Sequence, residues 1–347
     1  MRTVLVEISG ESLPLARAEA VAAAEAIGGR PGRDDPEWGP TLVSVELPDG
    51  TSGRELADRL GLARRVLELR AEPAAFDAVW PGLATGSSSA AVRRLGRPSS
   101  GGHDAGVLAA GREFARAGGR VDLEHPDHRL WLIGQGPGRD ALFEETAAID
   151  RPSASARRMP TLPFQRPVAL PPRLARAAAN LARIRPGDRV LDPFLGTGAL
   201  LAEAGLLGGQ LYGIDRDPAM VRGALRNLRH FGVSAEELVV GDAGTAQLAD
   251  PEGTFDAILT DPPYGRASST GGESARAVVE RVLPRWAVRV RPGGRVVLIS
   301  PGPVPPFADG WRERLAVPVR VHRSLTRQFC VFERAGEVTT TSGGTSG

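Results

Sequence analysis

The sequence predicts an α/β protein with a doubly wound, mostly parallel sheet in its C-terminal half and smaller α+β modules in its N-terminal half. After residue 172, short apolar strands alternate with helical segments, and this alternation is typical of a parallel sheet. Before residue 150, the pattern reads strand, helix, strand, helix, strand, and then one more helix and strand. Residues 150–172 are rich in proline and separate the two patterns, so they predict a domain boundary.

The N-terminal elements can be placed by their hydrophobic patterns. The expected strands cover residues 3–8, 41–47, 65–69 and 129–133, and the expected helices cover 15–27, 52–60 and 106–117. Residues 72–119 are rich in Gly, Ser, Ala and Pro, so "GSSSAAVRRLGRPSSGGHD" is expected to contain loops. The last twelve residues, 336–347, read as a disordered tail.

Composition narrows the class of protein. A chain of 347 residues with 41% hydrophobic and 24% charged residues is typical of a soluble protein of two or three domains. No apolar run approaches the ~20 residues of a membrane helix, and the first residues read as a strand rather than a signal peptide. The single cysteine, Cys330, excludes an internal disulfide and fits a reducing cytoplasm. The five histidines show no metal-ligand spacing, so we expect no metal.

Charge is distributed unevenly along the chain. All 43 basic residues are arginine, and residues 1–150 carry a net charge of −6 against +8 for the remainder. Nine arginines lie between Arg151 and Arg189 with one acid, Asp188, among them. The planar guanidinium suits phosphate contact, so this stretch somewhat favours nucleic-acid binding over a merely solvated surface.

Residues 189–192 form a short apolar strand that leads into "PFLGTGALLAEAGLLGG". A strand, a glycine loop and a helix form the first unit of a doubly wound fold, whose ligands bind at the carboxyl ends of the strands. Gly196 and Gly198 let the backbone approach a ligand closely because they carry no Cβ atom. The spacing is not Gly-x-Gly-x-x-Gly and no Lys-Ser/Thr follows, which disfavours dinucleotides and nucleoside triphosphates.

One aspartate follows each of four successive strands: Asp192, Asp215, Asp242 and Asp261. Any one of them could be a helix cap, but four along one sheet edge are hard to explain by capping. Asp215 can accept hydrogen bonds from both hydroxyl groups of a ribose, and Asp242 can accept one from an adenine amino group. The four aspartates therefore predict a cofactor site at this edge.

The motifs "LDPFLGTG" and "TDPPYG" resemble the first motif and the catalytic motif of class I S-adenosylmethionine-dependent methyltransferases that act on exocyclic amines. Residues 163–228, from "PFQRPVALPP" to "ALRNL", are similar to the tRNA guanine-10 N2-methyltransferases. "LVEISGESLPLARAEA" and "RVDLEHPDHRLWLI" look like the ferredoxin-like and THUMP modules of that family. Two departures stand out. Ala169 stands where the family often has serine, and the region before Arg120 is short and glycine-rich for a THUMP module.

The resemblance implies a domain order and a cofactor. It implies a ferredoxin-like domain over 1–70, a THUMP domain over 71–150, a linker over 151–165 and a Rossmann-like methyltransferase domain with a seven-stranded sheet over 166–335. S-adenosylmethionine is the implied cofactor, bound by Asp192, Gly196, Thr197, Gly198, Asp215, Asp242 and Asp261. The implied partner is tRNA. We expect a cytoplasmic monomer without a membrane contact, and the need for a small activator subunit is left open.

The proposed chemistry accounts for the aspartate, the two prolines and the tyrosine of "TDPPYG". An exocyclic amine on a base is a poor nucleophile because its lone pair is delocalised into the ring, so it must be held in line with the methyl group. The Asp261 carboxylate and the Pro262 carbonyl can each accept one of its N–H bonds, and the prolines fix these acceptors in place. Pro263 and Tyr264 are expected to contact the substrate, and the Tyr264 ring to stack on the base.

The sequence leaves open which residues contact the RNA and does not exclude two other functions. Arg93 and Arg94 in "AAVRRLGR", with Arg97, are the candidate RNA contacts of the N-terminal half. The catalytic motif also suits an amino methyltransferase acting on another RNA position or on DNA. The aspartate counts against a glutamine methyltransferase, which usually carries Asn-Pro-Pro-Tyr. A non-catalytic RNA-binding protein would not need the four aspartates. The sequence does not decide between mono- and dimethylation.

Overall fold

The computed structural model describes residues 1–33, 38–96, 104–134, 138–149, 162–166, 170–263, 274–302, 304, 309–322 and 325–336. The chain divides into two compact units, Met1–Ala154 and Ser155–Gly347, and the boundary falls within the proline-rich stretch. The finer division of the N-terminal half into residues 1–70 and 71–150 stays a prediction. Among the helices of these described ranges, none has the length and apolar character that crossing a membrane requires.

The first unit contains eight strands and five helical segments within its described residues. The strands are β1 (Arg2–Ile8), β2 (Arg30–Pro31), β3 (Leu42–Leu47), β4 (Ala63–Ala71), β5 (Ser89–Arg94), β6 (Arg120–Val121), β7 (His128–Ile133) and β8 (Ala141–Ala148). The helices are α1 (Leu13–Ala26), α2 (Gly53–Arg59), the 3-10 helix η2 (Pro73–Ala78), α3 (Trp80–Leu83) and α4 (Ala105–Arg116). All seven strands and helices predicted for this half are confirmed, within a few residues at their ends.

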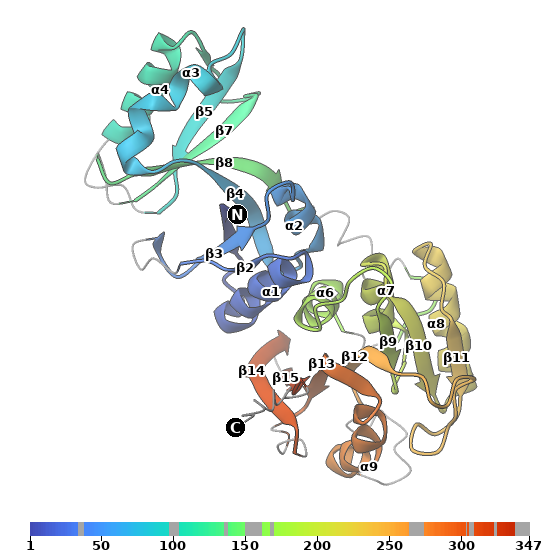
Figure 1. Cartoon of the computed structure of the whole chain (residues 1–347). Coiled ribbons are helices and arrows are strands. Elements are labelled where there is room, and N and C mark those ends of the chain that lie inside the picture. Colours follow the sequence, from blue (N-terminus) through green and yellow to red (C-terminus); the bar gives the residue numbers. More distant parts are fainter. Residues whose placement is uncertain are drawn as a thin grey trace, which may run out of the picture. The chain divides into compact units, whose positions relative to one another are not determined.

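One sheet with the order β2-β3-β1-β4-β8-β7-β5-β6 runs through the whole unit (Figure 1). Its strands pair antiparallel except β5, which is parallel to β7 and β6. The prediction of loops around "SSSAAVRR" was wrong for β5, whose first four residues are buried. Two of them, Ala90 and Val92, belong to a hydrophobic cluster that includes the buried Trp80 of α3 and Phe114 of α4.

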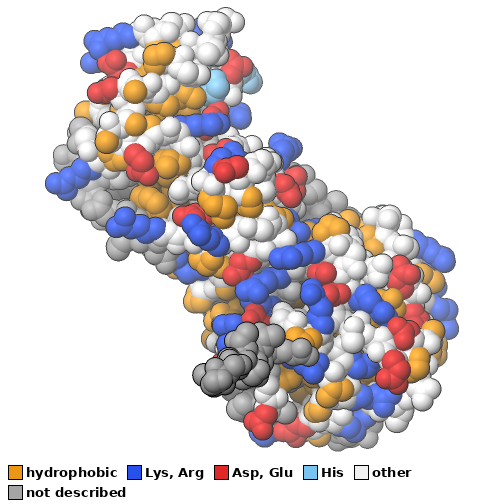
Figure 2. All heavy atoms as spheres, viewed as in Figure 1, with side chains coloured by type: hydrophobic (Ala, Val, Ile, Leu, Met, Phe, Trp, Pro, Cys, Tyr) orange, Lys and Arg blue, Asp and Glu red, His pale blue; other side chains and the backbone are white. Residues whose placement is uncertain are grey.

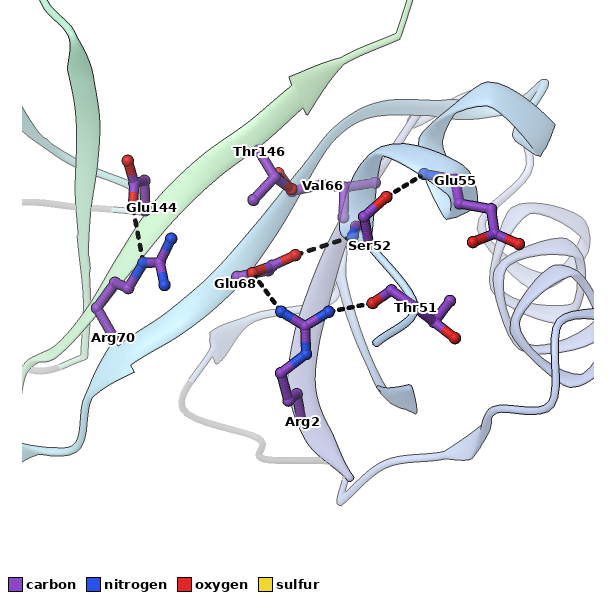
Figure 3. A network of polar contacts seen from close by, with 10 residues as sticks. Arg2, Thr51, Ser52, Glu55, Val66, Glu68, Arg70, Glu144 and Thr146 are labelled. Carbon is purple, nitrogen blue, oxygen red and sulfur yellow. Dashed lines mark hydrogen bonds and ion pairs between the residues drawn. The ribbon is translucent and has the colours of Figure 1, made fainter. Parts of the chain in front are cut away.

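The N-terminal end of α2 is fixed to the sheet by a polar network (Figure 3). Glu68 on β4 accepts hydrogen bonds from the Gly53 amide (2.8 Å) and from the Arg2 guanidinium of β1 (3.0 Å). The Ser52 hydroxyl caps the helix by accepting a hydrogen bond from the Glu55 amide at 3.2 Å. The Glu68 side chain can therefore be buried in the sheet, because both of its carboxylate oxygens accept hydrogen bonds.

The two arginines predicted to contact RNA lie on β5, but their environments differ. Arg93 is exposed and donates a hydrogen bond to the Leu123 carbonyl at 3.3 Å. The Arg94 side chain is only 6% exposed and is paired with Asp104 and with Asp140, the latter at 2.7 Å. These two carboxylates occupy the fork of Arg94 and raise its pKa. Arg94 joins β5 to the start of α4, and this geometry counts against it as a phosphate contact. Arg97 lies outside the described residues.

The second unit is built on a seven-stranded sheet. Its strands are β9 (Arg189–Asp192), β10 (Gln210–Asp215), β11 (Glu237–Val240), β12 (Phe255–Thr260), β13 (Val290–Ser300), β14 (Trp311–His322) and β15 (Leu325–Arg334). Its helices are α6 (Pro172–Leu181), α7 (Ala199–Leu206), α8 (Pro218–His230) and α9 (Ala275–Ala287). The strand order is β11-β10-β9-β12-β13-β15-β14, with β9 to β13 parallel and β15 antiparallel to both of its neighbours.

Helices cover both faces of this sheet, which confirms the doubly wound prediction. On β10, Ile214 belongs to the buried cluster that contains Trp286 of α9. The neighbouring Gly213 points the other way, where a Cβ atom would lie 3.1 Å from Leu201 of α7. The middle of β10 is thus covered on both faces, as is typical of a parallel sheet. Its polar site residue, Asp215, lies at the end of the strand.

The basic stretch between Arg151 and Arg189 does not form a separate patch where it is described. Arg176 of α6 is buried and paired with Glu203 of α7 at 2.7 Å. Arg183 is paired with Glu333 at 3.3 Å, and Arg189 with Asp250 at 3.2 Å. On the face of this unit shown in Figure 2, arginine and acidic side chains are interspersed. Three of the six arginines that the structure describes in this stretch are therefore engaged in ion pairs.

Candidate active site

The four predicted aspartates lie at one edge of the seven-stranded sheet. Asp192 and Asp215 are the last residues of β9 and β10, Asp261 directly follows β12, and Asp242 comes two residues after β11. In the strand register, Asp192 lies opposite Gly213, and Asp215 lies opposite Val240 of β11. The parallel direction of these strands brings their carboxyl ends together, and each carboxylate has different partners.

Asp192 connects the glycine loop to the end of β12. Its side chain is buried, and its Oδ1 accepts hydrogen bonds from the Phe194 amide and the Thr260 hydroxyl, each at 3.0 Å. The pKa of Asp192 is raised to about 7, mainly by burial and also by the nearby carboxylates of Asp261 and Asp215, while its two hydrogen bonds act in the opposite direction. The buried Asp192 side chain thus holds the start of the glycine loop against the end of β12.

Asp192→Asn is expected to make the thermal stability of the protein fall less steeply as the pH rises. A carboxyl group with a folded pKa of about 7 and an unfolded one near 3.9 stabilises the fold fully below about pH 4, and this contribution is lost as the pH rises through 7. Asparagine keeps an acceptor for Phe194 and Thr260 but cannot ionise. Thermal melts between about pH 5 and pH 8 should show a steeper fall in Tm for the wild type. Parallel curves would show that Asp192 does not titrate in this range.

Asp215 holds the glycine loop at its open side. Its Oδ2 accepts a hydrogen bond from the Gly196 amide at 2.8 Å, and its Oδ1 accepts one from Asp217 at 2.9 Å. Burial raises the pKa of Asp215. Gly196 has φ +52° and Gly198 φ +79°, a conformation that favours glycine. A Cβ on Gly198 would lie 3.0 Å from that of Ala224, whereas one on Gly196 would meet nothing nearer than 3.9 Å.

Asn227 of α8 is a site residue that no sequence motif predicts. Its amide nitrogen donates to the carbonyls of Thr197 and Phe164, and its oxygen accepts from the Phe164 amide, all at 3.0 Å. The Phe164 ring lies against Gly223, where a Cβ atom would come within 2.1 Å of it. Asn227 therefore fastens residues 162–166 and the glycine loop to one helix. The available signal was an asparagine on the buried face of α8.

Asp242 is more exposed than Asp192 and Asp215. It accepts a hydrogen bond from the Gly244 amide at 2.7 Å and pairs with Arg281 of α9 at 2.9 Å. The Arg281 hydrogen bond lowers the pKa of Asp242. The guanidinium passes directly over Gly244, where a Cβ atom would lie 2.1 Å from it. No motif in the sequence indicates Arg281 as a partner of Asp242.

Asp261 forms an ion pair with Arg327 of β15. The Asp261 side chain is 19% exposed and the Arg327 side chain only 3%, so the carboxylate lies on the accessible side of the pair. Pro262 is buried and Pro263 partly buried. Tyr264 lies outside the described residues, so its stacking role stays a prediction.

The described residues at this edge offer hydrogen-bond acceptors to an organic ligand. Nowhere in the described part of the chain do three or more His, Cys, Asp or Glu side chains gather as a metal site. The Gly196 backbone has an open side and the carboxylate of Asp215 lies next to it, so a hydroxyl-bearing ligand could approach both. The edge can therefore accept hydrogen bonds from hydroxyl and amino groups.

Comparison with known proteins finds methyltransferases among the proteins to which this chain is similar. A family model described as "RMKL-like, methyltransferase domain" matches residues 161–304, and one described as "DNA methylase" matches 76–226. A tRNA (guanine(10)-N2)-dimethyltransferase from Methanothermobacter thermautotrophicus is 37% identical over 62% of this chain and 64% of its own length. A probable tRNA (guanine(10)-N2)-dimethyltransferase from Methanothermococcus thermolithotrophicus is 31% identical over 47% of this chain and 98% of its own length. TrmN from Thermus thermophilus superposes with a TM-score of 0.46 at 24% identity, covering 96% of this chain and 99% of that one.

Proposed function

This chain belongs to the family of the tRNA (guanine(10)-N2)-methyltransferases, and we propose that it methylates the exocyclic N2 amine of guanosine 10 in tRNA with S-adenosylmethionine. The observation that carries the proposal is the position of Asp261. Its carboxylate lies at the same sheet edge as the glycine loop, and Thr260 beside it is hydrogen-bonded to Asp192 at 3.0 Å. An acceptor for an amine is thus held next to the proposed cofactor loop.

The residues at this edge fit the proposed cofactor. The carboxylate of Asp215 and the open backbone at Gly196 suit a ribose, and Asp242 has an exposed side chain that suits an adenine amino group. When bound, S-adenosylmethionine supplies an electrophilic methyl group on a sulfonium. Asp192 and Asn227 would act indirectly, because they hold the loop rather than face its open side.

The protein would contribute positioning rather than a specially tuned base. We propose that the Asp261 carboxylate accepts one N–H of the guanine amine and the Pro262 carbonyl the other, so that the lone pair of the amine is aimed at the methyl group. Asp261 also offers a negative charge to the positive charge that develops on the amine. The proposed stacking of the base on Tyr264 and Pro263 would keep it in that plane.

Two alternatives make different predictions. An enzyme acting on DNA is weakly favoured by the DNA methylase match, but that match ends at residue 226 and omits Asp261 and Pro262. A non-catalytic RNA-binding protein would bind tRNA without S-adenosylmethionine. Incubating the full chain with labelled S-adenosylmethionine and either bulk tRNA or duplex DNA separates the three readings. We expect label in tRNA only; label in DNA or in neither would overturn the proposal.

Asp215→Ala is expected to weaken S-adenosylmethionine binding about 30-fold, because two hydrogen bonds to a charged acceptor are lost. Asp215→Glu retains the carboxylate and should lose less affinity. Calorimetric titration of both variants measures the difference. If the two variants lose affinity equally, Asp215 serves only to hold the Gly196 amide, and the ribose contact is wrong.

The N-terminal unit is proposed to capture RNA through the predicted THUMP module. Arg93 remains the candidate contact, because its side chain is exposed on β5, whereas Arg94 is not included. A small activator subunit, the monomeric state and a cytoplasmic location stay predictions.

A further inference from the structure

The antiparallel strand β15 brings an arginine to the carboxyl edge of the parallel strands. Gln328 of β15 pairs with Ser300, the last residue of β13. Arg327 precedes Gln328, so it lies just beyond the end of β13. Because β15 runs opposite to its neighbour, its first residues reach the edge at which the parallel strands end. The guanidinium of Arg327 reaches across the end of β13 to Asp261 at the end of β12.

The ion pair has an inner and an outer member. The Arg327 side chain is 3% exposed, and Phe329 on the same strand is fully buried. Burying a guanidinium carries a large desolvation cost that a carboxylate partner offsets. The Asp261 side chain, at 19% exposed, is the member that substrate can reach. Of the two side chains, Asp261 is thus the more accessible and Arg327 lies behind it.

The end of β12 is anchored on both sides. Thr260 donates a hydrogen bond to Asp192 of β9, and Asp261 accepts one from Arg327 of β15. The charged groups that face Asp261 among the described residues include the Asp192 carboxylate, which repels it, and the Arg327 guanidinium, which attracts it. A bond from the guanidinium to Oδ2 restricts rotation of the carboxylate, which otherwise turns freely about its terminal bond.

We propose that Arg327 is a positioning residue that fixes the plane and the charge of the Asp261 carboxylate for capture of the guanine amine. This inference rests on the proposed function and extends it to a residue of the antiparallel strand. A merely structural role, in which the pair only ties β12 to β15, is the alternative. The two roles differ in how kcat, binding and stability respond to substitution.

Three variants of the full chain test the proposal. Arg327→Met removes the charge but keeps the length of the side chain, and Arg327→Lys keeps the charge without the planar fork. Arg314→Met is the control, because Arg314 also pairs with a carboxylate, Glu333, but at 2.6 Å on β14 away from the site. Each variant is assayed well below its own Tm for kcat, KM for tRNA and Kd for S-adenosylmethionine.

We expect Arg327→Met to lower kcat about 100-fold, the typical effect of misplacing a reacting group, with KM and Kd changed less than about threefold. Arg327→Lys should fall between it and the wild type, and Arg314→Met should match the wild type. The double variant Asp261→Ala/Arg327→Met should be no slower than Asp261→Ala alone, since the two residues act as one unit.

Other outcomes overturn the positioning role. If kcat, KM, Kd and Tm all deteriorate together, or the double variant is slower by the product of both single effects, Arg327 is structural. If Arg327→Met does not fold, Asp261→Asn/Arg327→Met removes both charges, and it should fold and match Asp261→Asn in kcat. A wild type that methylates tRNA beside an Arg327→Met variant with kcat within about threefold overturns this inference alone. A wild type that transfers no methyl group overturns the proposed function as well.

Discussion

Replacing Asp261 with alanine is expected to lower kcat about 1,000-fold and to leave the Kd for S-adenosylmethionine within about threefold of the wild type. The carboxylate is proposed to act on the amine mainly in the transition state, so its loss affects the rate rather than cofactor binding. Asp261→Asn keeps an oxygen acceptor but lacks the negative charge, and its kcat should lie between the two. Steady-state rates on tRNA and calorimetric titrations measure both quantities.

The Arg327 pair sets a condition for this experiment. Asp261→Ala leaves a guanidinium with 3% exposure without this carboxylate, and removing one partner of a buried pair costs about 3–5 kcal/mol of folding stability. Rates must therefore be compared at a temperature at which thermal melts show all variants to be folded. A folded Asp261→Ala enzyme with near wild-type kcat would end the amino-methyltransferase proposal.

Asn227→Leu is expected to lower the free energy of unfolding by about 3 kcal/mol and to weaken S-adenosylmethionine binding. Leucine has a similar size but leaves the Phe164 amide and the carbonyls of Phe164 and Thr197 without their 3.0 Å partners. The glycine loop and residues 162–166 would then lose their common attachment to α8. Urea unfolding and cofactor titration measure the two effects.

Arg226→Leu is the matched control for this change, because Arg226 precedes Asn227 on the same helix and its side chain is exposed. Its stability should change by less than about 0.5 kcal/mol. If Asn227→Leu behaves like Arg226→Leu, the hydrogen bonds of Asn227 contribute little. If it loses stability but binds the cofactor normally, Asn227 supports the fold and not the loop.

The sequence could predict the fold of the second unit because its signals are local. Alternation of apolar strands with helices indicates a parallel sheet, and a parallel sheet puts the residues after its strands at one edge. Asp192, Asp215, Asp242 and Asp261 were found by this logic. In the first unit, β5 was missed because its small residues, Ser89 to Ala91, lie between Gly- and Ser-rich segments that read as loops.

The partners of these aspartates could not be predicted in the same way. Arg281 lies 39 residues from Asp242 and Arg327 lies 66 residues from Asp261, and both come from elements with no loop motif. A search limited to residues that follow parallel strands also misses Arg327, because the first residues of the antiparallel strand β15 reach the same edge. The burial of Arg94 could not be predicted for a related reason. A basic residue in a polar segment reads as exposed until its buried partners, Asp104 and Asp140, are placed beside it.

The measurement that tests the central claim most directly is methylation of two tRNA transcripts that differ in one amino group. One transcript carries guanosine at position 10 and the other inosine, which lacks the exocyclic N2 amine. With the full chain and labelled S-adenosylmethionine, we predict that the guanosine transcript alone is labelled, and that nucleoside analysis finds the label in N2-methylguanosine or N2,N2-dimethylguanosine. Equal labelling of both transcripts, or label in any other nucleoside, would contradict the proposal that Asp261 and Pro262 present this amine for methylation.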